Sequence, residues 1–192
     1  EGLKLTSCYS AAPVCSPARA GFLTGRIPER CAIYDHISSP RFRDTHDIEY
    51  ARMSPKEITI AELLKDGGYE TCLVGKWHLD TRFEDLDGVG MPDNQGFDYY
   101  MATENNAASS HKNPRNFIRN GEKLGKLSGY SNDLILDECV HWLTNVRDRS
   151  KPFFLYVALH SPHENIATPP EFTQLYDSGN LKKDEYYGNV SH

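Results

Sequence analysis

The sequence lacks a long hydrophobic run, a surplus of basic residues and paired cysteines. No apolar stretch approaches the roughly 20 residues that a membrane-spanning helix needs, and residues 153–159 have only the length of a buried strand. Lys and Arg number 21 against 27 Asp and Glu, and this acidic balance argues against general nucleic-acid binding. The five cysteines show no Cys-x-x-Cys spacing, so they indicate neither a disulfide framework nor a zinc site.

The pattern of apolar residues predicts alternating helices and strands. At 192 residues the chain is long enough to bury a core. The alternation predicts an α/β fold, with a mostly parallel sheet flanked by helices, in which residues 1–192 form part of a single domain. Strands are expected at residues 3–9, 69–74 and 153–159, a hairpin at 117–123, and helices at 17–23, from 54 onward and at 131–146.

Capping residues mark two of the expected helix starts. Ser54 is placed to cap one helix, with Glu57 three residues later for a capping box, and Ser131 is placed to cap another. The strand at 153–159 is apolar almost throughout, which is typical of a strand that is covered on both faces.

Cys15 has the setting of a nucleophile at a helix N-terminus. Pro17 suits a first helical position, and Gly25 suits a left-handed helix end. Unpaired backbone N–H groups at such a position favour a negative charge on the sulfur, and Arg19 adds a positive charge one turn later. A nucleophile at a helix N-terminus with an arginine beside it would bind an anionic sulfate or phosphate ester. A buried structural cysteine beside a surface arginine is the alternative interpretation of these residues alone.

The whole string resembles the signature of the type I sulfatases, Cys-x-Pro-x-Arg followed by Thr-Gly-Arg. Cys15, Pro17 and Arg19 match the core of this signature, and residues 23–26 (Leu-Thr-Gly-Arg) match its extension. In that family the cysteine is converted after translation to formylglycine. The resemblance implies a fold like that of alkaline phosphatase and the sulfatases, and an activity that hydrolyses sulfuric esters.

A second group of polar residues follows the strand expected at 69–74. In an extended segment Lys76 and His78 share one face, whereas Trp77 packs on the other. Lysine supplies a compact positive charge, and histidine can carry a proton near neutral pH. Alone, these residues would suit an exposed lysine beside a packed tryptophan. However, residues 75–79 (Gly-Lys-Trp-His-Leu) also resemble the second sulfatase motif, and residues 96–100 resemble a further landmark.

Polar residues also follow the strand at 153–159 and fill the loops before it. His163 is the better match to the histidine that the family carries beyond this strand, and His160 is its competitor. Other loop residues could bind a hydroxylated substrate, although ordinary turn chemistry explains them as well: Asn105, Asn106 and His111. Two further histidines in a polar loop are expected to be solvated, His36 and His46.

The resemblance implies a role for each matching residue. A hydrated formylglycine at position 15 would attack sulfur with one hydroxyl and expel sulfate with the other. Arg19 would steady the hydrate, and Lys76 would bind the sulfate oxygens. His78 would assist the elimination, and His163 would help to protonate the leaving oxygen. The family also holds calcium, to which the modified Cys15 would give one oxygen, but the family's carboxylate ligands match no motif of this chain.

The resemblance also implies partners and a location. The partners would be a small-molecule or oligosaccharide sulfate ester and a formylglycine-generating or equivalent maturase. The location would be the periplasm, the exterior or the lysosome, although residues 1–4 do not show the pattern of a signal peptide. The chain is expected to be an N-terminal part of a sulfatase catalytic domain, without its first strand and C-terminal portion, and to be inactive alone.

The sequence leaves the nature of the substrate open. Polar loops suit a sulfated carbohydrate more than a sterol. One alternative is a phosphonate or phosphate ester hydrolase of the same superfamily, which can use the same aldehyde. Another is a non-catalytic, sulfatase-like binding module.

Overall fold

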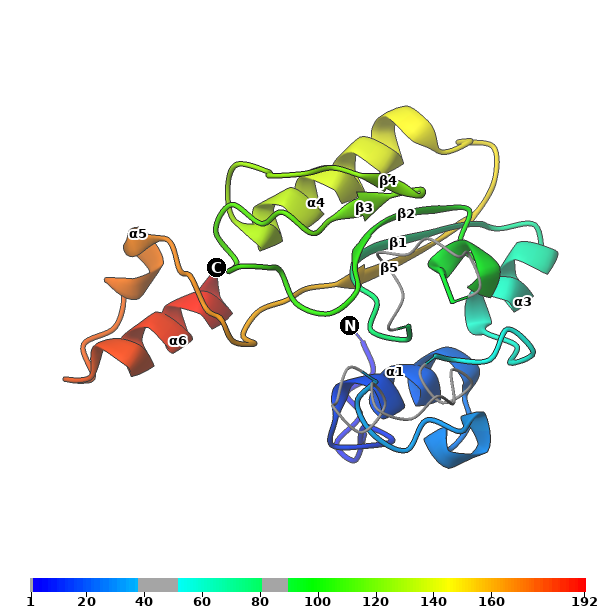
Figure 1. The fold of residues 1–192 in the computed structure, drawn as a ribbon, viewed down its shortest axis with the longest axis horizontal. Helices are drawn as coiled ribbons and strands as arrows, with labels where there is room; N and C mark the ends of the chain where they lie inside the picture. Colours follow the sequence, from blue (N-terminus) through cyan, green and yellow to red (C-terminus); the bar gives the residue numbers. More distant parts are fainter. Residues whose placement is uncertain (1, 38–51, 81–89) are drawn as a thin grey trace.

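The described part of the chain is built on one mixed β-sheet. The structure is a computed structural model, and it describes residues 2–37, 52–80 and 90–192. Across these residues five strands lie in the order β4-β3-β2-β1-β5 (Figure 1). The central β1 (Glu70–Lys76) pairs in parallel with β2 (Tyr99–Thr103) and with β5 (Phe153–Ala158). The short hairpin of β3 (Ile118–Arg119) and β4 (Glu122–Lys123) adds antiparallel, where the sequence predicts it.

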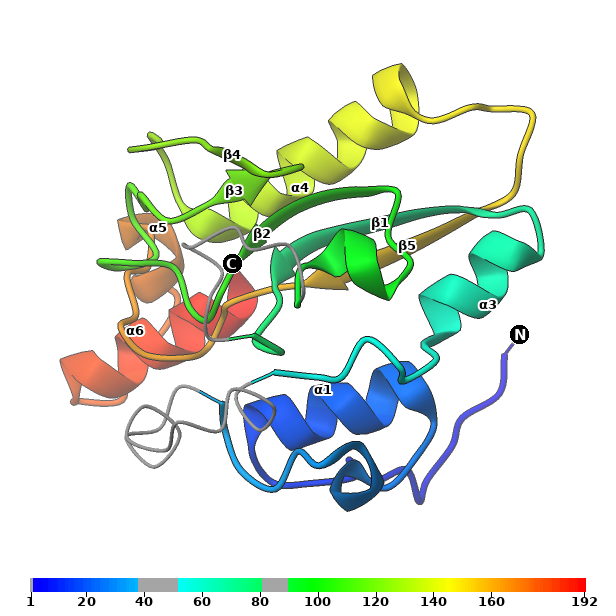
Figure 2. The same ribbon diagram turned by 45° about the vertical axis from the view of Figure 1, so that its right-hand side comes forward.

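Helices cover both faces of this sheet, which confirms the predicted α/β fold. α1 (Cys15–Thr24) and α3 (Ile60–Asp66) lie on one side, and α4 (Ser131–His141) lies on the other (Figures 1 and 2). No helix among the described residues combines the length and apolarity that crossing a membrane requires. The other helical segments of the described residues are η1 (Pro28–Cys31), η3 (Pro92–Gln95), η4 (Trp142–Val146), α5 (Pro170–Thr173) and α6 (Leu181–Ser191).

Strand alternation divides the buried residues into two cores. Leu73 of β1 and Tyr100 of β2 join the core under α1 and α3. Val74 and Met101, their neighbours along the chain, point to the opposite face and pack with Ile135 of α4. Successive residues of a strand face opposite sides, so each strand helps to anchor the helices on both faces. The position of α1 against the sheet is fixed in this way.

Two predicted features of the strands are wrong. Residues 3–9 form no strand, and the side chains of Leu3 and Tyr9 are 87% and 89% exposed. No strand of the described residues pairs with this segment, and alternation alone supplies no ladder of hydrogen bonds. β5 is present, but Phe153 and Val157 stay partly exposed because β5 lies at the edge of the described sheet.

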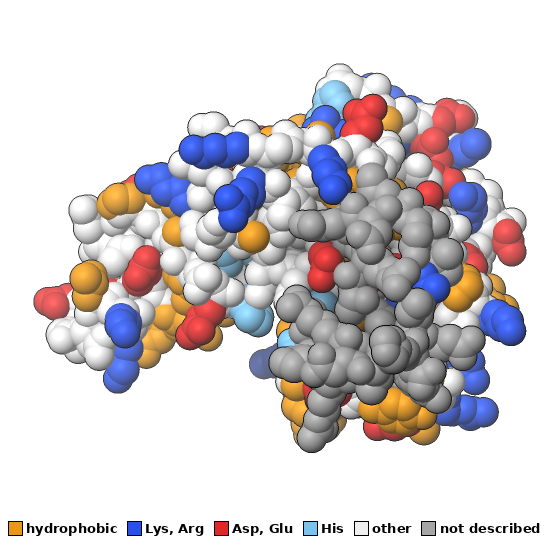
Figure 3. Space-filling view, viewed as in Figure 1, with side chains coloured by type: hydrophobic (Ala, Val, Ile, Leu, Met, Phe, Trp, Pro, Cys, Tyr) orange, Lys and Arg blue, Asp and Glu red, His pale blue; other side chains and the backbone are white. Residues whose placement is uncertain are grey.

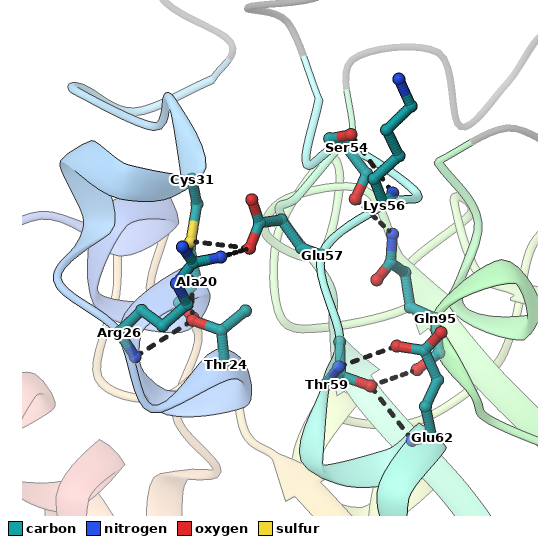
Figure 4. Close-up of polar contacts among 10 residues, drawn as sticks. All are labelled: Ala20, Thr24, Arg26, Cys31, Ser54, Lys56, Glu57, Thr59, Glu62 and Gln95. Carbon is teal, nitrogen blue, oxygen red and sulfur yellow. Dashed lines mark hydrogen bonds and ion pairs between the residues drawn. The ribbon is translucent and has the colours of Figure 1, made fainter.

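The helix starts also differ from the prediction. Thr59, not Ser54, caps α3, and its hydroxyl and Glu62 form the capping box. Ser54 instead caps a turn, because the carboxylate of Glu57 lies 2.5 Å from Arg26 and is engaged there (Figure 4). The N-cap of α4 is Tyr130, not Ser131, which is the first residue of the helix. α1 begins at Cys15, two residues before Pro17.

Candidate functional site

Four segments meet at the end of the sheet where the parallel strands have their carboxyl ends. The parallel strands β1, β2 and β5 all end there, and the N-terminus of α1 lies against the same end of the sheet. The carboxyl ends of parallel strands are where open α/β sheets place ligands. The polar residues after each strand are therefore brought together.

Cys15 and Lys76 form the centre of this site. Cys15 opens α1, and Lys76 ends β1 with only 3% of its surface exposed. The Lys76 Nζ donates a hydrogen bond to the Cys15 Sγ over 3.3 Å. Burial lowers the pKa of the lysine, and the negative charge that the thiol can carry partly opposes this effect.

Arg19 supplies a second cation from the same helix. Its Nη1 donates to the backbone oxygen of Lys76 over 2.6 Å and to the hydroxyl of Tyr156 over 3.3 Å. Burial lowers the pKa of Arg19, whereas Tyr156 and Cys15 raise it. Tyr156 was not predicted as a site residue. The one signal in the sequence was a hydroxyl within an otherwise apolar strand.

Asn106 connects Lys76 to His163. The Asn106 Oδ1 accepts a hydrogen bond from the Lys76 Nζ over 3.1 Å, and its Nδ2 lies 2.7 Å from the His163 Nδ1. His163 itself is exposed, so it can meet a molecule that arrives from solvent. Histidine side chains are visible near the middle of the face drawn in Figure 3. Asn105 lies beside Asn106 and is half-buried.

His160, the competitor of His163, lies inside the protein. It is 2% exposed, and its Nε2 lies 2.8 Å from the hydroxyl of Thr103. That hydroxyl donates to the Asn105 backbone oxygen, so it accepts from His160 and the proton lies on Nε2. Burial, followed by the charge of His111, lowers the pKa of His160 to about 3. His160 is thus a neutral, interior group that ties β5 to β2.

His78 is a buried, neutral imidazole two residues after Lys76. It is fully buried, and its backbone takes the left-handed conformation with φ 58°. Burial lowers its pKa to about 2, assisted by Lys76 and then by His36, whose ring lies 5.6 Å away. Trp77, between Lys76 and His78, packs into the core under α1 and α3, as the alternation predicts.

His111, which was predicted to bind a hydroxylated substrate, is instead buried. His111 is 1% exposed, and burial lowers its pKa. Its ring lies 6.1 Å from that of His160, so in this structure it supports the loop from within and does not present a side chain to solvent. His46 lies outside the described residues.

The described residues do not by themselves fit a calcium site. Residues 2–37, 52–80 and 90–192 contain no group of three or more His, Cys, Asp or Glu side chains that could hold a metal ion. Calcium prefers carboxylate and carbonyl oxygens, whereas Cys15 accepts a hydrogen bond from the ammonium of Lys76, a cation.

Comparison with known proteins identifies the family. The family model described as Sulfatase matches residues 1–190. The chain is 31% identical to rat N-acetylgalactosamine-6-sulfatase over 187 residues, which are 90% of this chain and 35% of that protein. It is 42% identical to rat steryl-sulfatase over 104 residues, or 54% of this chain and 18% of that protein. The chain therefore belongs to the sulfatase family.

A solved structure shows the same fold. BT4656, in complex with D-glucosamine-2-N,6-O-disulfate, superposes with a TM-score of 0.65 at 26% identity. The match covers 88% of this chain and 29% of BT4656. The chain thus spans about a third of the length of the relatives that it matches.

Proposed function

We propose that the protein of which this chain is a part hydrolyses sulfate monoesters, with a formylglycine derived from Cys15 as its nucleophile. The observation that carries this proposal is the contact between Lys76 and Cys15, with Arg19 anchored beside them. A catalyst for sulfate esters needs a nucleophile, neutralisation of the oxyanion and a proton for the departing alcohol. The candidate groups for these three tasks are Cys15, Lys76 and His163, and they lie near the carboxyl ends of the parallel strands.

A formylglycine hydrate would supply two hydroxyls, one to attack sulfur and one to expel sulfate as the aldehyde re-forms. An unmodified thiol would instead leave a stable sulfur adduct. We assign the ammonium of Lys76 to bind the sulfate oxygens and Arg19 to steady the group at position 15; the hydrogen bond of Lys76 to Cys15 and the electrostatic interaction of Arg19 with Cys15 support these roles. We assign His78, which follows Lys76 by two residues, to assist the elimination step. We assign His163 to protonate the leaving oxygen, because its side chain is exposed and Asn106 links it to Lys76.

We propose a sulfated carbohydrate as the substrate class. The name of the rat N-acetylgalactosamine-6-sulfatase and the disulfated glucosamine bound to BT4656 support it. The steryl-sulfatase match is higher in identity but covers about half of the chain. A maturase that oxidises Cys15, an extracytoplasmic or lysosomal location, and calcium held with ligands beyond those described belong to the same proposal.

The test compares sulfate and phosphate monoesters of one alcohol, using the full-length protein produced together with a maturase. The proposal predicts a higher kcat/KM for the sulfate ester and its loss in Cys15→Ala. A higher kcat/KM for the phosphate ester would establish a phosphohydrolase instead, and no turnover of either ester by aldehyde-bearing protein would favour a binding module. The segment of residues 1–192 alone is expected to be inactive, and turnover by it would contradict that expectation.

A further inference from the structure

We propose that a cationic surface beside the candidate site binds additional sulfate groups of a polysulfated oligosaccharide. The surface consists of four exposed side chains on the β3–β4 hairpin and the loops that flank it: Lys112, Arg115, Lys123 and Lys126. The inference rests on the proposed function, which assigns one sulfate group to the candidate site itself. It adds that the substrate carries several negative charges rather than one.

The charge of this segment is opposite to that of the whole chain. Residues 105–130 contain five Lys and Arg residues but a single carboxylate, Glu122, so the segment carries a charge of +4. The whole chain carries −6, and the other residues therefore carry −10. Because like charges repel one another, such a cluster attracts an anionic partner. Figure 3 shows Lys and Arg side chains gathered over the hairpin region, on the same face as histidine side chains.

Arg115 and Lys126 form the middle of the cationic surface. The Leu127 N–H donates a hydrogen bond to the Pro114 backbone oxygen over 2.8 Å. Arg115 directly follows one of these residues and Lys126 directly precedes the other, so their backbones are neighbours. Both side chains are exposed, and an anion can approach them from solvent.

Lys112 and Lys123 extend the surface on either side of this pair. Lys112 forms a β-bridge with Tyr130, and its ammonium lies 5.4 Å from the centre of the Tyr130 ring. Lys123 lies in β4, opposite Ile118 of β3. The four cations thus stand on adjacent backbone segments that hydrogen bonds hold together.

No carboxylate of the described residues neutralises these four side chains. Arg119, the fifth basic residue of the segment, forms an ion pair with Glu138 over 2.5 Å and is therefore engaged inside the protein. Across residues 2–37, 52–80 and 90–192, none of the four cations makes an ion pair or a side-chain hydrogen bond. Their charges are available to an anion from outside.

The cationic surface begins at the margin of the candidate site. The Arg115 N–H donates to the Ala108 backbone oxygen over 2.8 Å, and the Asn116 Nδ2 donates to the Asn106 backbone oxygen over 2.9 Å. The side chain of Asn106 in turn accepts a hydrogen bond from Lys76. An oligosaccharide with one sulfate group at Lys76 can therefore extend over Arg115 and its neighbours.

The experiment measures binding by the full-length protein that carries Cys15→Ala, so that a bound ester is not turned over. Two fluorescent probes are titrated at low salt, a hexasaccharide with several sulfate groups and its monosulfated analogue. Arg115→Gln combined with Lys126→Gln should raise the Kd of the polysulfated probe by about 3- to 30-fold, because two exposed charge pairs are lost. The Kd of the monosulfated probe should change by less than about 2-fold. Salt should reduce the difference between the probes.

The matched control removes one arginine and one lysine elsewhere. Arg149 and Lys151 are exposed and precede β5, at the opposite end of the sheet from the candidate site. Arg149→Gln combined with Lys151→Gln should change both Kd values by less than about 2-fold. An unchanged Kd in the first variant, or an equal loss in the control, would overturn the proposal. Tighter binding of single-stranded DNA of the same charge, weakened by the first variant, would overturn it in favour of nucleic acid.

The binding assay separates this inference from the proposed function. Binding of the probes needs no aldehyde at position 15, so the selective loss in the first variant would support the cationic surface even if maturase-treated protein hydrolyses no sulfate ester. Turnover of a sulfate ester together with unchanged Kd values would refute the cationic surface alone.

Discussion

The buried His160 should make the protein lose stability as the pH falls. Its pKa is about 3 in the folded protein, against an ordinary value of 6.5. A histidine with a depressed pKa stays neutral when folded but takes up a proton when unfolded, so its effect begins below about pH 6.5 and grows until about pH 3. Between about pH 6.5 and about pH 5, a span of about 1.5 pH units, the unfolded histidine binds a proton that the folded histidine does not. This corresponds to about 2 kcal/mol of unfolding free energy.

Urea unfolding at the two pH values measures this contribution. His160→Gln keeps a neutral donor for Thr103 but cannot be protonated, so its loss of stability from about pH 8 to about pH 5 should be about 2 kcal/mol smaller than that of the native protein. Ile135→Val is the control, because it removes a methyl group from the core and should weaken the protein equally at both pH values. An identical pH dependence in the native protein and His160→Gln would refute the reasoning.

Three further outcomes are expected. Gly75→Ala should cost more than about 3 kcal/mol of unfolding free energy in a denaturation assay, because the new Cβ would lie 2.0 Å from a backbone oxygen of β5. The control is Gly121→Ala, at a glycine that also has a positive φ but no neighbour within 4 Å, and it should cost about 1 kcal/mol. Lys76→Met should lower kcat/KM for a sulfate ester by at least about 100-fold, while the free energy of unfolding stays the same or rises. An activity near the native value would contradict the role of Lys76. Arg26→Ala should cost only about 0.5 to 1 kcal/mol, since its ion pair with Glu57 is partly exposed, and a loss several times larger would show a wider role for this pair.

The ends of the parallel strands were the most predictable part of the protein. Lys76 comes two residues after the end of the segment 69–74, which predicts a strand, and a charged residue there is expected near the carboxyl end of that strand, where α/β sheets bind ligands. The placement of Trp77 in the core follows from the same alternation. Arg19 was predictable because one helical turn separates it from Cys15.

The helix cap and the links within the site could not be read from the sequence. Ser54 and Thr59 each stand three residues before a glutamate, so both predict a capping box. Only the fold brings Arg26, 31 residues away from Glu57 in sequence, close enough to engage that carboxylate and leave Thr59 as the cap. The amide link of Asn106 to His163 likewise spans 57 residues, and no local pattern encodes it.

The most direct measurement relates the oxidation of Cys15 to turnover. Samples of the full-length protein are prepared with different extents of maturation, and mass spectrometry gives the fraction with an aldehyde at position 15. The account predicts that sulfate release rises in proportion to this fraction and vanishes with the thiol form. Equal sulfate release from thiol and aldehyde forms would contradict it.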